Sequence, residues 1–307
     1  MTHVTVVIVT WNTRDLTGEG VQSVLSNAAG QVSEIIVVDN ASTDGTAELL
    51  AERFPEVRLI RNERNVGFAV ATNQGAAASA SEVLLLLNSD ARLLPGALPA
   101  MREILEREPR AAIVGARLVN TDGSFQASHS RFPNLMRELL ILSGVGRLLI
   151  GRTYPSRGPE TERGPQVVDY VEGACLLVPR QVYLDVGGLD AGYFMYSEEV
   201  DLCYAVRRDG WQVWYQPAAA VVHLGGASSH TRPTGREADL YRSRVRFFLK
   251  HHGRGQAALL TLMIYTLTML KQVLHAVLRA ATGGRRGRQV VGWRELRASL
   301  RESGAAR

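Results

Sequence analysis

Short runs of apolar residues recur along the first ninety positions of the chain. They are rich in Val, Ile and Leu without strict polar alternation, which is typical of strands covered on both faces of a mostly parallel sheet. Stretches of helical character separate these runs. The predicted strands are Val4–Thr10, Glu34–Val38, Val57–Ile60 and Val83–Leu87, and the predicted helices lie near Asp15–Ser26, Gly45–Phe54 and Phe68–Ser79. This alternation predicts a layered α/β domain with its ligand crevice at the carboxyl ends of the strands.

The residue pattern in the middle of the chain predicts a helix, a hairpin and a long irregular connection. The helix runs from Pro95 to about Glu108, and the hairpin strands Ile113–Val119 and Phe125–His129 flank the turn Asn120–Ser124. Residues 131–166 show no clear period and carry many Gly, Pro and Arg. Connections of this length are usually functional or disordered, and we interpret this one as a mobile lid over a substrate.

Regular patterning returns after Val167 and changes in character after Arg236. Strands are predicted at Val171–Val178, Trp211–Tyr215 and Ala220–His223, a helix at Ser197–Arg208, and basic helix beyond Arg236. We therefore expect one α/β domain over residues 1–230, whose halves cover about 1–95 and 96–230, followed by a helical extension over residues 231–307.

Charge is distributed unevenly between these two parts. Residues 1–230 carry 19 Lys and Arg against 26 Asp and Glu, whereas residues 231–307 carry 16 against 4, giving net charges of −7 and +12. The basic extension favours an anionic partner, either a lipid surface or nucleic acid, and a solvated basic face is the alternative. The whole chain of 307 residues is 46% hydrophobic and 21% charged, which excludes a disordered or fibrous protein.

Cysteine usage and the start of the chain favour a cytoplasmic protein. Cys175 and Cys203 both lie among apolar neighbours, so we expect no disulfide framework and a reducing compartment. The first residues, MTHVTVVIVTWN, lack a basic region before a short β-branched apolar run. That pattern does not predict a signal peptide.

Polar residues gather where three of the predicted strands end. The clusters are Thr10-Trp11-Asn12, Asp39-Asn40-Ala41-Ser42 and Asn88-Ser89-Asp90. One such cluster is an ordinary turn, because Asn, Asp and Ser form local hydrogen bonds there, but three at equivalent places predict a site. The turn after the first strand contains no glycine and the chain has no GxxxxGK[ST] segment, so an NAD-binding or P-loop site is disfavoured.

Several ordered segments carry a family resemblance over roughly residues 3–230. They read VVIVTWN at 6–12, IIVVDNASTDGT at 35–46, NVGFAVATNQG at 65–75, LLLLNSD at 84–90, EGACLLV at 172–178 and GGLDAGYFMYSEEVDLC at 187–203. In this order they resemble the inverting glycosyltransferases of family 2, which have the GT-A fold. The most similar subgroup is the rhamnosyltransferase-like enzymes that elongate cell-surface polysaccharides or glycolipids.

The resemblance implies a nucleotide-sugar site in the first half of the chain. Asp39 matches the carboxylate that binds the pyrimidine or ribose of the donor, and a carboxylate accepts well from an imide N–H or a hydroxyl. The alternative for Asp39 is a local turn at the start of the following helix. The remaining residues that the resemblance assigns to the donor are Thr10, Asn12, Asn40, Asn65, Gly67, Asn88, Ser89, Asp90 and Gly173.

The same resemblance implies a divalent metal, Mg²⁺ or Mn²⁺. Asn88-Ser89-Asp90 falls where the family carries its metal-binding DxD, with asparagine in place of the first aspartate. Asp90 offers a hard oxygen ligand, and Asn88 offers a neutral carbonyl or an indirect hydrogen bond. His223 lies where relatives supply a histidine to the metal, and a structural histidine is the alternative.

The segment Glu198-Glu199-Val200-Asp201 matches the acidic segment in which this family places its catalytic base. Acidic residues also favour the first turn of a helix through the macrodipole, by about 0.3–1 kcal/mol each. Glu198 and Asp201 share a helix face, whereas Glu199 points about 100° away from Glu198. We assign Glu199 as the base by its match to the second acidic position, with Glu198 or Asp201 orienting the acceptor.

An apolar run over residues 257–270 ends at Lys271 within the basic extension. It is short for a membrane span, which needs about 20 residues, and suits a helix lying on anionic lipid. Packing on the catalytic domain or on a second copy of the chain is the alternative. Residues 279–307 contain one aromatic residue, Trp293, which disfavours nucleic acid. The flanking arginines are Arg242, Arg244, Arg246, Arg254, Arg279, Arg285, Arg286 and Arg288.

Together these features predict a glycosyltransferase at the inner face of the cell membrane. The expected reaction moves a sugar, rhamnose from dTDP-rhamnose, to a hydroxyl of a lipid-linked saccharide. A non-catalytic nucleotide-sugar-binding or scaffold protein of the same fold is the alternative, because the DxD is degraded at Asn88.

Overall fold

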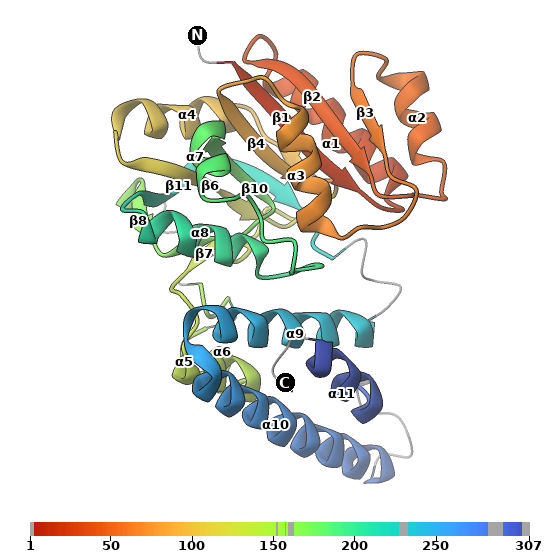
Figure 1. Ribbon diagram of the computed structural model, residues 1–307, viewed down its shortest axis with the longest axis vertical. Helices are drawn as coiled ribbons and strands as arrows, with labels where there is room; N and C mark the ends of the chain where they lie inside the picture. The colour runs from red at the N-terminus through yellow and green to blue at the C-terminus, as the bar shows by residue number, and fades with distance from the viewer. Residues whose placement is uncertain are drawn as a thin grey trace. The chain divides into compact units, whose positions relative to one another are not determined.

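The computed structural model describes residues 3–151, 153–156, 158, 163–226, 233–281 and 291–302. Its centre is a nine-stranded sheet with the strand order β3-β2-β1-β4-β10-β6-β11-β5, and β8 pairs with β11 (Figure 1). This architecture confirms the predicted class, a mixed and mostly parallel sheet flanked by helices and followed by C-terminal helices.

The first four strands explain why the polar clusters meet. Strands β1 (Val4–Thr10), β2 (Val32–Asp39), β3 (Arg58–Arg61) and β4 (Val83–Asn88) are parallel. In this register Thr10 pairs with Asp39, and Val9 pairs with Asn88. The carboxyl ends of β1, β2 and β4 therefore lie at one edge of the sheet, with the three polar clusters beside one another.

The second half of the sheet mixes strand directions. Strand β10 (Cys175–Pro179) runs antiparallel between β4 and β6 (Ala111–Val119), whereas β11 (Gln212–His223) is parallel to β6. Strands β5 (Ala91–Leu93) and β8 (Gln166–Val168) add to β11 in the antiparallel direction. A separate pair joins β7 (His129–Ser130) to β9 (Tyr170–Val171).

Helices cover both faces of the sheet. Residues of α1 (Arg14–Asn27), α2 (Thr46–Arg53) and α4 (Ala97–Arg107) share one buried apolar core with alternate residues of β1. Helix α3 (Phe68–Ala78) packs on the other face, where Figure 1 shows it in front of the sheet with α7 (Arg180–Asp185) and α8 (Glu198–Arg208). Burial on both faces explains why the strands lack polar alternation.

Four local predictions differ from the structure. The connection at 131–166, expected to be irregular, contains α5 (Leu135–Ser143) and α6 (Val145–Leu149), and its role as a lid stays a prediction. The predicted strand Val171–Val178 is interrupted by a turn at Gly173–Ala174, and the two strands after Trp211 are one strand with a register shift between Gln216 and Ala220. The predicted hairpin is reduced to a single bridge between Val119 and Phe125.

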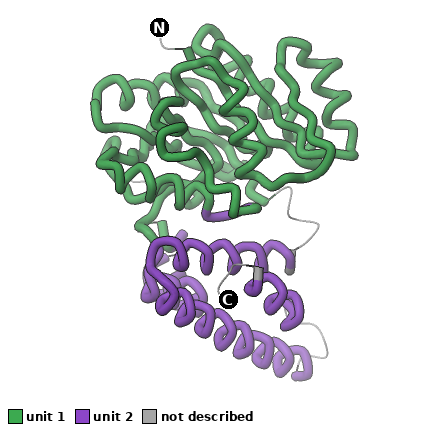
Figure 2. The backbone as a smooth tube through the Cα atoms, in the orientation of Figure 1, with its two compact units in different colours: residues 1–132, 155–194, 198–228 green, residues 133–154, 195–197, 229–307 purple. Residues whose placement is uncertain are grey.

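The chain divides into two compact units (Figure 2). Unit 1 comprises residues 1–132, 155–194 and 198–228, and unit 2 comprises residues 133–154, 195–197 and 229–307. Residues 133–154, which the pattern assigned to the first domain, therefore belong with the C-terminal helices. Unit 2 contains α5, α6, α9 (Pro233–His251), α10 (Gly253–Ala281) and α11 (Trp293–Glu302).

Polar contacts hold unit 2 together. Arg244 of α9 donates to the buried carboxylate of Glu138 on α5 over 2.7 Å, and Arg242 pairs with Asp239 within α9. These two arginines, predicted to flank a lipid-facing helix, thus have partners inside the unit. Arg285, Arg286 and Arg288 lie outside the described residues.

The two cysteines of unit 1 are both free and buried, as predicted. Burial raises the pKa of each thiol to about 12. Both therefore stay in the protonated form at neutral pH, which is typical of cysteines that serve packing.

Candidate functional site

The loop after β1 and the loop after β2 are joined by backbone-to-side-chain hydrogen bonds. The Asn12 N–H donates to the Ser42 hydroxyl (2.9 Å), and the Thr43 N–H donates to Oδ1 of Asn12 (2.8 Å). Asn12 and Ala41 both have left-handed backbones, with φ of 52° and 67°. Such conformations cost free energy in residues other than glycine and cluster at functional loops.

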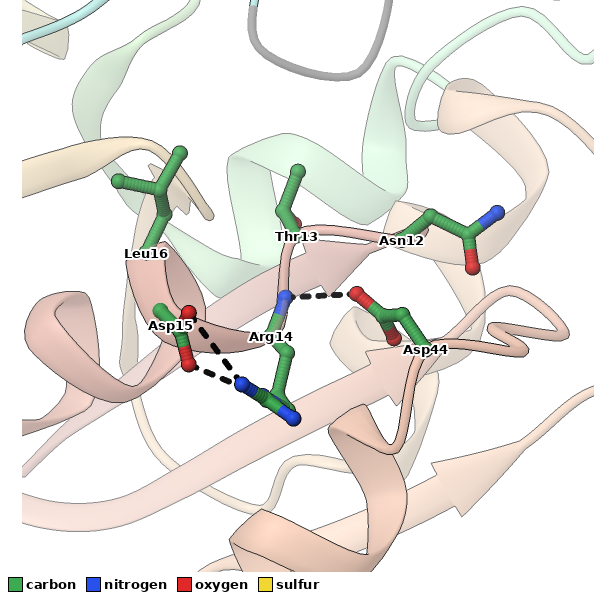
Figure 3. A pocket seen from close by; sticks show the side chains of 6 residues that line it. All are labelled: Asn12, Thr13, Arg14, Asp15, Leu16 and Asp44. Atoms are coloured by element: carbon green, nitrogen blue, oxygen red, sulfur yellow. Dashed lines mark hydrogen bonds and ion pairs between the residues drawn. The ribbon is translucent and has the colours of Figure 1, made fainter.

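These loops border an open pocket of about 390 Å³ (Figure 3). Figure 3 shows the carboxylate of Asp44 facing the backbone nitrogen of Arg14, which donates to Oδ2 over 2.9 Å. Asn12 is the predicted donor-binding residue at this pocket. The lining residues are Asn12, Thr13, Arg14, Asp15, Leu16 and Asp44.

Asp44 stays ionised in this pocket. Partial burial raises its pKa, but hydrogen bonds from Thr46 and from the Arg14 N–H lower it by more, so its pKa lies below the ordinary value. The Asp44 carboxylate also accepts from the N–H of Thr46, the first residue of α2, over 3.1 Å. Asp44 thus fixes the geometry of both loops, a role that the sequence pattern did not indicate.

Thr10 and Ser89 are linked through a buried cluster of hydroxyl groups. The Thr10 hydroxyl lies 2.7 Å from that of Thr17 and 3.0 Å from that of Thr13, and Thr13 donates to Ser89 over 3.0 Å. Thr10 has no exposed surface. These contacts tie the end of β1 to the turn after β4, and a direct contact of either hydroxyl with a donor remains a prediction.

Asp39 forms a local turn before the following helix, which was the alternative to its predicted role in donor binding. Its Oδ1 accepts from the Ser42 N–H over 3.0 Å, and the residue is 1% exposed. The same turn places the Asp39 carboxyl beside the end of β1 through the pairing with Thr10. Its contact with a pyrimidine or ribose remains a prediction.

Asn40 organises the loop that contains Asn65 and Gly67. Its Oδ1 accepts from the Asn62 amide and the Val66 N–H, both at 3.1 Å. Its Nδ2 donates to Asn65 Oδ1 (3.0 Å) and to the Gly67 carbonyl (3.3 Å). All four hydrogen-bonding positions of the amide are in use, so Asn40 acts on the site by holding this loop.

Gly67 lies against Phe194, the residue that ends the middle segment of unit 1. Its φ is 88°, and a Cβ at this position would lie 2.9 Å from the Phe194 carbonyl oxygen. The next residue, Phe68, donates its N–H to the same oxygen over 2.8 Å. Only glycine suits this backbone and this close approach, which explains the Asn-Val-Gly-Phe segment physically.

Asp90 and His223 meet at the carboxyl edge of the sheet. The antiparallel pairing of β11 with β5 aligns His223 with Ala91, and Nε2 of His223 lies 3.3 Å from Oδ1 of Asp90. The Leu224 N–H donates to the Asp90 carbonyl over 3.1 Å. Both side chains are largely buried, so the geometry brings together two of the three predicted metal ligands.

The side chains at this position fit a divalent cation. Carboxylate oxygen binds both Mg²⁺ and Mn²⁺, and imidazole nitrogen suits Mn²⁺ better than Mg²⁺, which prefers oxygen ligands. In the part of the chain that the structure describes, no group of three His, Cys, Asp or Glu side chains is arranged to hold a metal. Further ligands would therefore come from Asn88, from water or from the diphosphate of a bound nucleotide.

The predicted acidic cluster begins α8. Tyr196 and Ser197, directly before the helix, have left-handed backbones with φ of 72° and 65°. Glu198 is buried, and burial, then the charge of Glu199 and that of Glu172, raise its pKa well above the ordinary value. Glu198 is therefore protonated under conditions in which an exposed glutamate is ionised.

Asp201 supports the loop that precedes α8. The hydroxyl of Tyr193 donates to its Oδ1 over 3.3 Å, and both side chains are buried. Asp201 is thus joined to the segment that contains Phe194. Its contact with an acceptor stays a prediction. The hydrogen bond from Tyr193 indicates that Asp201 holds the loop before α8 in place.

Glu199 lies against the turn between β9 and β10. A Cβ added to Gly173 would lie 3.2 Å from the Cβ of Glu199, and the neighbouring Ala174 accepts the Asn88 N–H over 2.9 Å. One two-residue turn thus touches both the Asn88-Ser89-Asp90 segment and Glu199. The predicted metal-binding segment and the predicted base are neighbours in space.

Several residues of the site were missed from the sequence. Asp44, Asn62, Gln126 and Glu172 contact or influence the predicted site, but none was singled out from the sequence. The available signals were that Asp44 and Glu172 lie within the IIVVDNASTDGT and EGACLLV segments and that Asn62 directly follows β3.

The mixed sheet carries three polar loops at one edge with a carboxylate cluster beside them, which is the arrangement expected of the GT-A fold. The family model described as glycosyl transferase family 2 matches residues 5–174, which is more than half of the chain. The chain belongs to this family, as the ordered segments predicted.

Curated relatives agree with this assignment. The chain is 32% identical over 247 residues to N-acetylglucosaminyl-diphospho-decaprenol L-rhamnosyltransferase from Mycobacterium tuberculosis, covering 74% of this chain and 78% of that protein. It is 24% identical over 211 residues to the low-salt glycan biosynthesis hexosyltransferase Agl10 from Haloferax volcanii, covering 67% and 63%. The chain is therefore a rhamnosyltransferase-like glycosyltransferase.

Solved structures of low identity share the fold. The mannosyltransferase PcManGT from Pyrobaculum calidifontis, in complex with GDP-Man and Mn²⁺, matches with a TM-score of 0.58 at 15% identity, covering 99% of this chain and 86% of that one. GalNAc-T7 with UDP, GalNAc and Mn²⁺ matches with a TM-score of 0.59 at 17% identity, covering 81% and 48%.

Proposed function

We propose that the protein transfers L-rhamnose from dTDP-rhamnose to a hydroxyl of a lipid-linked saccharide during the synthesis of cell-surface polysaccharide. The observation that carries this proposal is the turn at Gly173–Ala174, which contacts Glu199 on one side and Asn88 on the other. The name of the Mycobacterium tuberculosis relative supports rhamnose as the sugar and a diphospho-polyprenol saccharide as the acceptor.

In the proposed reaction Glu199 acts as general base in a single displacement with inversion. It takes the proton from the acceptor hydroxyl, a role that contributes typically 10²–10⁴-fold to rate. Its position against Gly173 limits the side-chain rotamers that it can adopt. Glu198, the preceding residue on α8, is protonated and therefore adds no negative charge next to Glu199.

Asp90 and His223, with Asn88, would hold a divalent cation. Such an ion stabilises the negative charge that develops on the departing nucleoside diphosphate. The solved structures PcManGT and GalNAc-T7 both contain Mn²⁺ with their nucleotides, which supports this part of the proposal. Asn12, Asp39 and the loop held by Asn40 would position the nucleoside.

We also propose that unit 2 binds the inner face of the cell membrane, where a lipid-linked acceptor is found. Helix α10 buries one face through Ala257, Leu260, Ile264 and Thr268 and exposes large apolar side chains on the other. By length and composition it could also cross a membrane. Arg254 and Arg279 are exposed near its two ends, which favours anionic lipid. The exposed apolar residues of α10 include Leu259, Leu262, Met269, Leu270, Val273, Leu274 and Val277.

The segment after α5 also exposes large apolar side chains in unit 2. Leu148, Leu149 and Ile150 are 83%, 73% and 56% exposed, which is unusual for three consecutive large apolar residues of a water-soluble surface. Insertion of both elements into lipid would remove this apolar area from water. A second copy of the chain is the competing occupant of the same surface.

A transfer assay tests the proposed reaction. The purified chain is incubated with N-acetylglucosaminyl-diphospho-polyprenol and one nucleotide sugar at a time, and both nucleotide release and the lipid product are measured. We expect a rhamnosylated lipid from dTDP-rhamnose alone. Transfer of another sugar would overturn the donor, and binding without transfer of any sugar would favour the non-catalytic alternative.

A further inference from the structure

Gln126 contacts the ring of His223 on the side away from Asp90. Its Oε1 lies 2.6 Å from Nδ1 of His223, whereas Nε2 of the same ring faces Asp90. Gln126 itself is anchored by its backbone N–H, which donates to the Leu118 carbonyl over 2.9 Å. The imidazole is therefore held between an amide and a carboxylate.

The orientation of the Gln126 amide follows from its other contacts. Its nitrogen donates to the backbone carbonyl of His223 over 3.2 Å and to Oδ1 of Asn120 over 3.1 Å. A backbone carbonyl is an acceptor only, so the amide nitrogen must lie on that side. The oxygen then faces Nδ1, and a hydrogen bond between them requires the proton on Nδ1.

This arrangement leaves the lone pair of Nε2 directed at Asp90. In a neutral ring with its proton on Nδ1, Nε2 and Oδ1 of Asp90 are two acceptors 3.3 Å apart. Two facing acceptors repel one another unless a cation lies beside them. The geometry thus prepares a nitrogen and an oxygen ligand for the same ion.

We propose that Gln126 is a positioning residue of the cation site, which selects the Nδ1–H tautomer of His223 and aims Nε2 at the ion. The proposal rests on the metal part of the proposed function. Groups that hold the far nitrogen of a ligating histidine fix its tautomer and orientation, and their loss typically costs about 10–100-fold in metal affinity. Gln126 acts through His223 and does not touch the ion.

Two variants of Gln126 separate tautomer control from simple packing. Gln126→Leu replaces the amide by an apolar side chain, which can pack against the ring but cannot accept a hydrogen bond from Nδ1. Gln126→Glu keeps an acceptor at the same distance, so it should preserve the Nδ1–H tautomer. Gln181→Leu on α7 removes an exposed glutamine amide far from this ring in the sequence and serves as the matched control.

Two measurements on the intact chain decide the proposal. Long-range ¹H–¹⁵N spectra of ¹⁵N-histidine-labelled, metal-free protein at mildly alkaline pH report which ring nitrogen of His223 carries the proton. Titration with Mn²⁺ alone, followed by electron paramagnetic resonance, gives the dissociation constant. We expect Nδ1–H in the wild type and Gln126→Glu, mixed tautomers in Gln126→Leu, and about 10–100-fold weaker Mn²⁺ binding in Gln126→Leu.

Different results identify different failures. An Nε2–H tautomer in the wild type, or unchanged tautomer and Mn²⁺ binding in Gln126→Leu, would overturn the role of Gln126. Absence of Mn²⁺ binding by the wild type would overturn the cation site. Neither measurement requires rhamnose transfer. A failure of the transfer assay caused by a wrong donor or acceptor is therefore distinguishable from a failure of the cation site or of the role of Gln126.

Discussion

Gly173 lies directly against the side chain of Glu199. A Cβ at position 173 would be 3.2 Å from Cβ and 3.4 Å from Cγ of Glu199, which is closer than ordinary van der Waals contact. The absence of a side chain at 173 therefore lets the glutamate rest on the turn between β9 and β10. The small residue thus makes room for the predicted base, and the expected close approach of the backbone at Gly173 to the donor sugar stays a prediction.

Replacement Gly173→Ala should displace Glu199 and slow transfer while leaving donor affinity within a few-fold of wild type. Displacement of a catalytic group by about 1 Å can cost about 10²-fold in rate. The kcat for transfer and the Kd for dTDP-rhamnose are the quantities to compare. Gly255→Ala is the matched control, because nothing lies within 4 Å of a Cβ there. An unchanged kcat in Gly173→Ala would show that Glu199 tolerates the shift.

Glu199→Gln should retain the fold and donor binding but lose turnover. The amide preserves the size of the side chain but cannot accept the acceptor proton, so we expect kcat to fall by about 10²–10⁴-fold. Calorimetric titration with the donor and a steady-state transfer assay measure the two properties separately. Glu103→Gln, which changes an exposed glutamate on α4, is the control. Full activity of Glu199→Gln would remove this residue from the mechanism.

Glu198 predicts a pH dependence of stability. Its pKa is raised in the folded protein, first by burial, so the folded state binds more protons than the unfolded state above the ordinary glutamate pKa. The free energy of unfolding therefore decreases as pH rises through the range between the ordinary glutamate pKa and the raised pKa of folded Glu198, because ionising Glu198 favours unfolding. Glu198→Gln does not titrate, so its Tm relative to wild type should increase across that range.

The measurement is a series of thermal melts of both proteins at matched ionic strength. Glu103→Gln again serves as the control, since an exposed carboxylate contributes little to a pH-dependent difference. A difference in Tm between Glu198→Gln and wild type that stays constant with pH would contradict the raised pKa.

The strands of the first half were predictable from sequence because both faces of the sheet are covered. Continuous Val, Ile and Leu runs mark β1 and β4, and their parallel register then brings Thr10, Asp39 and Asn88 to one edge. Helical segments α5 and α6 were missed because they are short, leave apolar residues such as Leu148 exposed and bury the charged Glu138, so their apolar residues do not mark a buried face.

The contacts between distant parts of the site could not be derived from the sequence. Asp90 meets His223 through the pairing of β11 with the three-residue strand β5, which is too short to show a period of two. Burial of Glu198 is equally invisible, because acidic residues in the first turn of a helix are usually exposed. The resemblance singled out Asp90, His223 and Glu198, but their geometry depends on tertiary packing.

Removal of divalent metal should abolish transfer, and Asp90→Asn should raise the Mn²⁺ concentration needed to restore it. The amide keeps the shape of Asp90 but lacks the negative charge that binds a hard cation, so we expect at least a tenfold change, about 1.4 kcal/mol. Transfer after EDTA treatment and Mn²⁺ titration gives the half-saturating concentration. Asp185→Asn on α7 is an exposed control. Activity that persists in EDTA would mean that the site works without a metal.

Charge on the exposed face of α10 should release the protein from membranes. Leu262 and Val273 are 62% and 57% exposed, so the double variant Leu262→Glu and Val273→Glu should fold while its carboxylates resist burial in lipid. Flotation with vesicles containing anionic lipid measures binding, and we expect the variant to stay with the unbound fraction. Leu184→Glu places one carboxylate on an exposed leucine of unit 1 and should still bind. If the wild type instead sediments as a dimer that this double variant dissociates, and vesicle binding is unchanged, the face contacts a second copy of the chain.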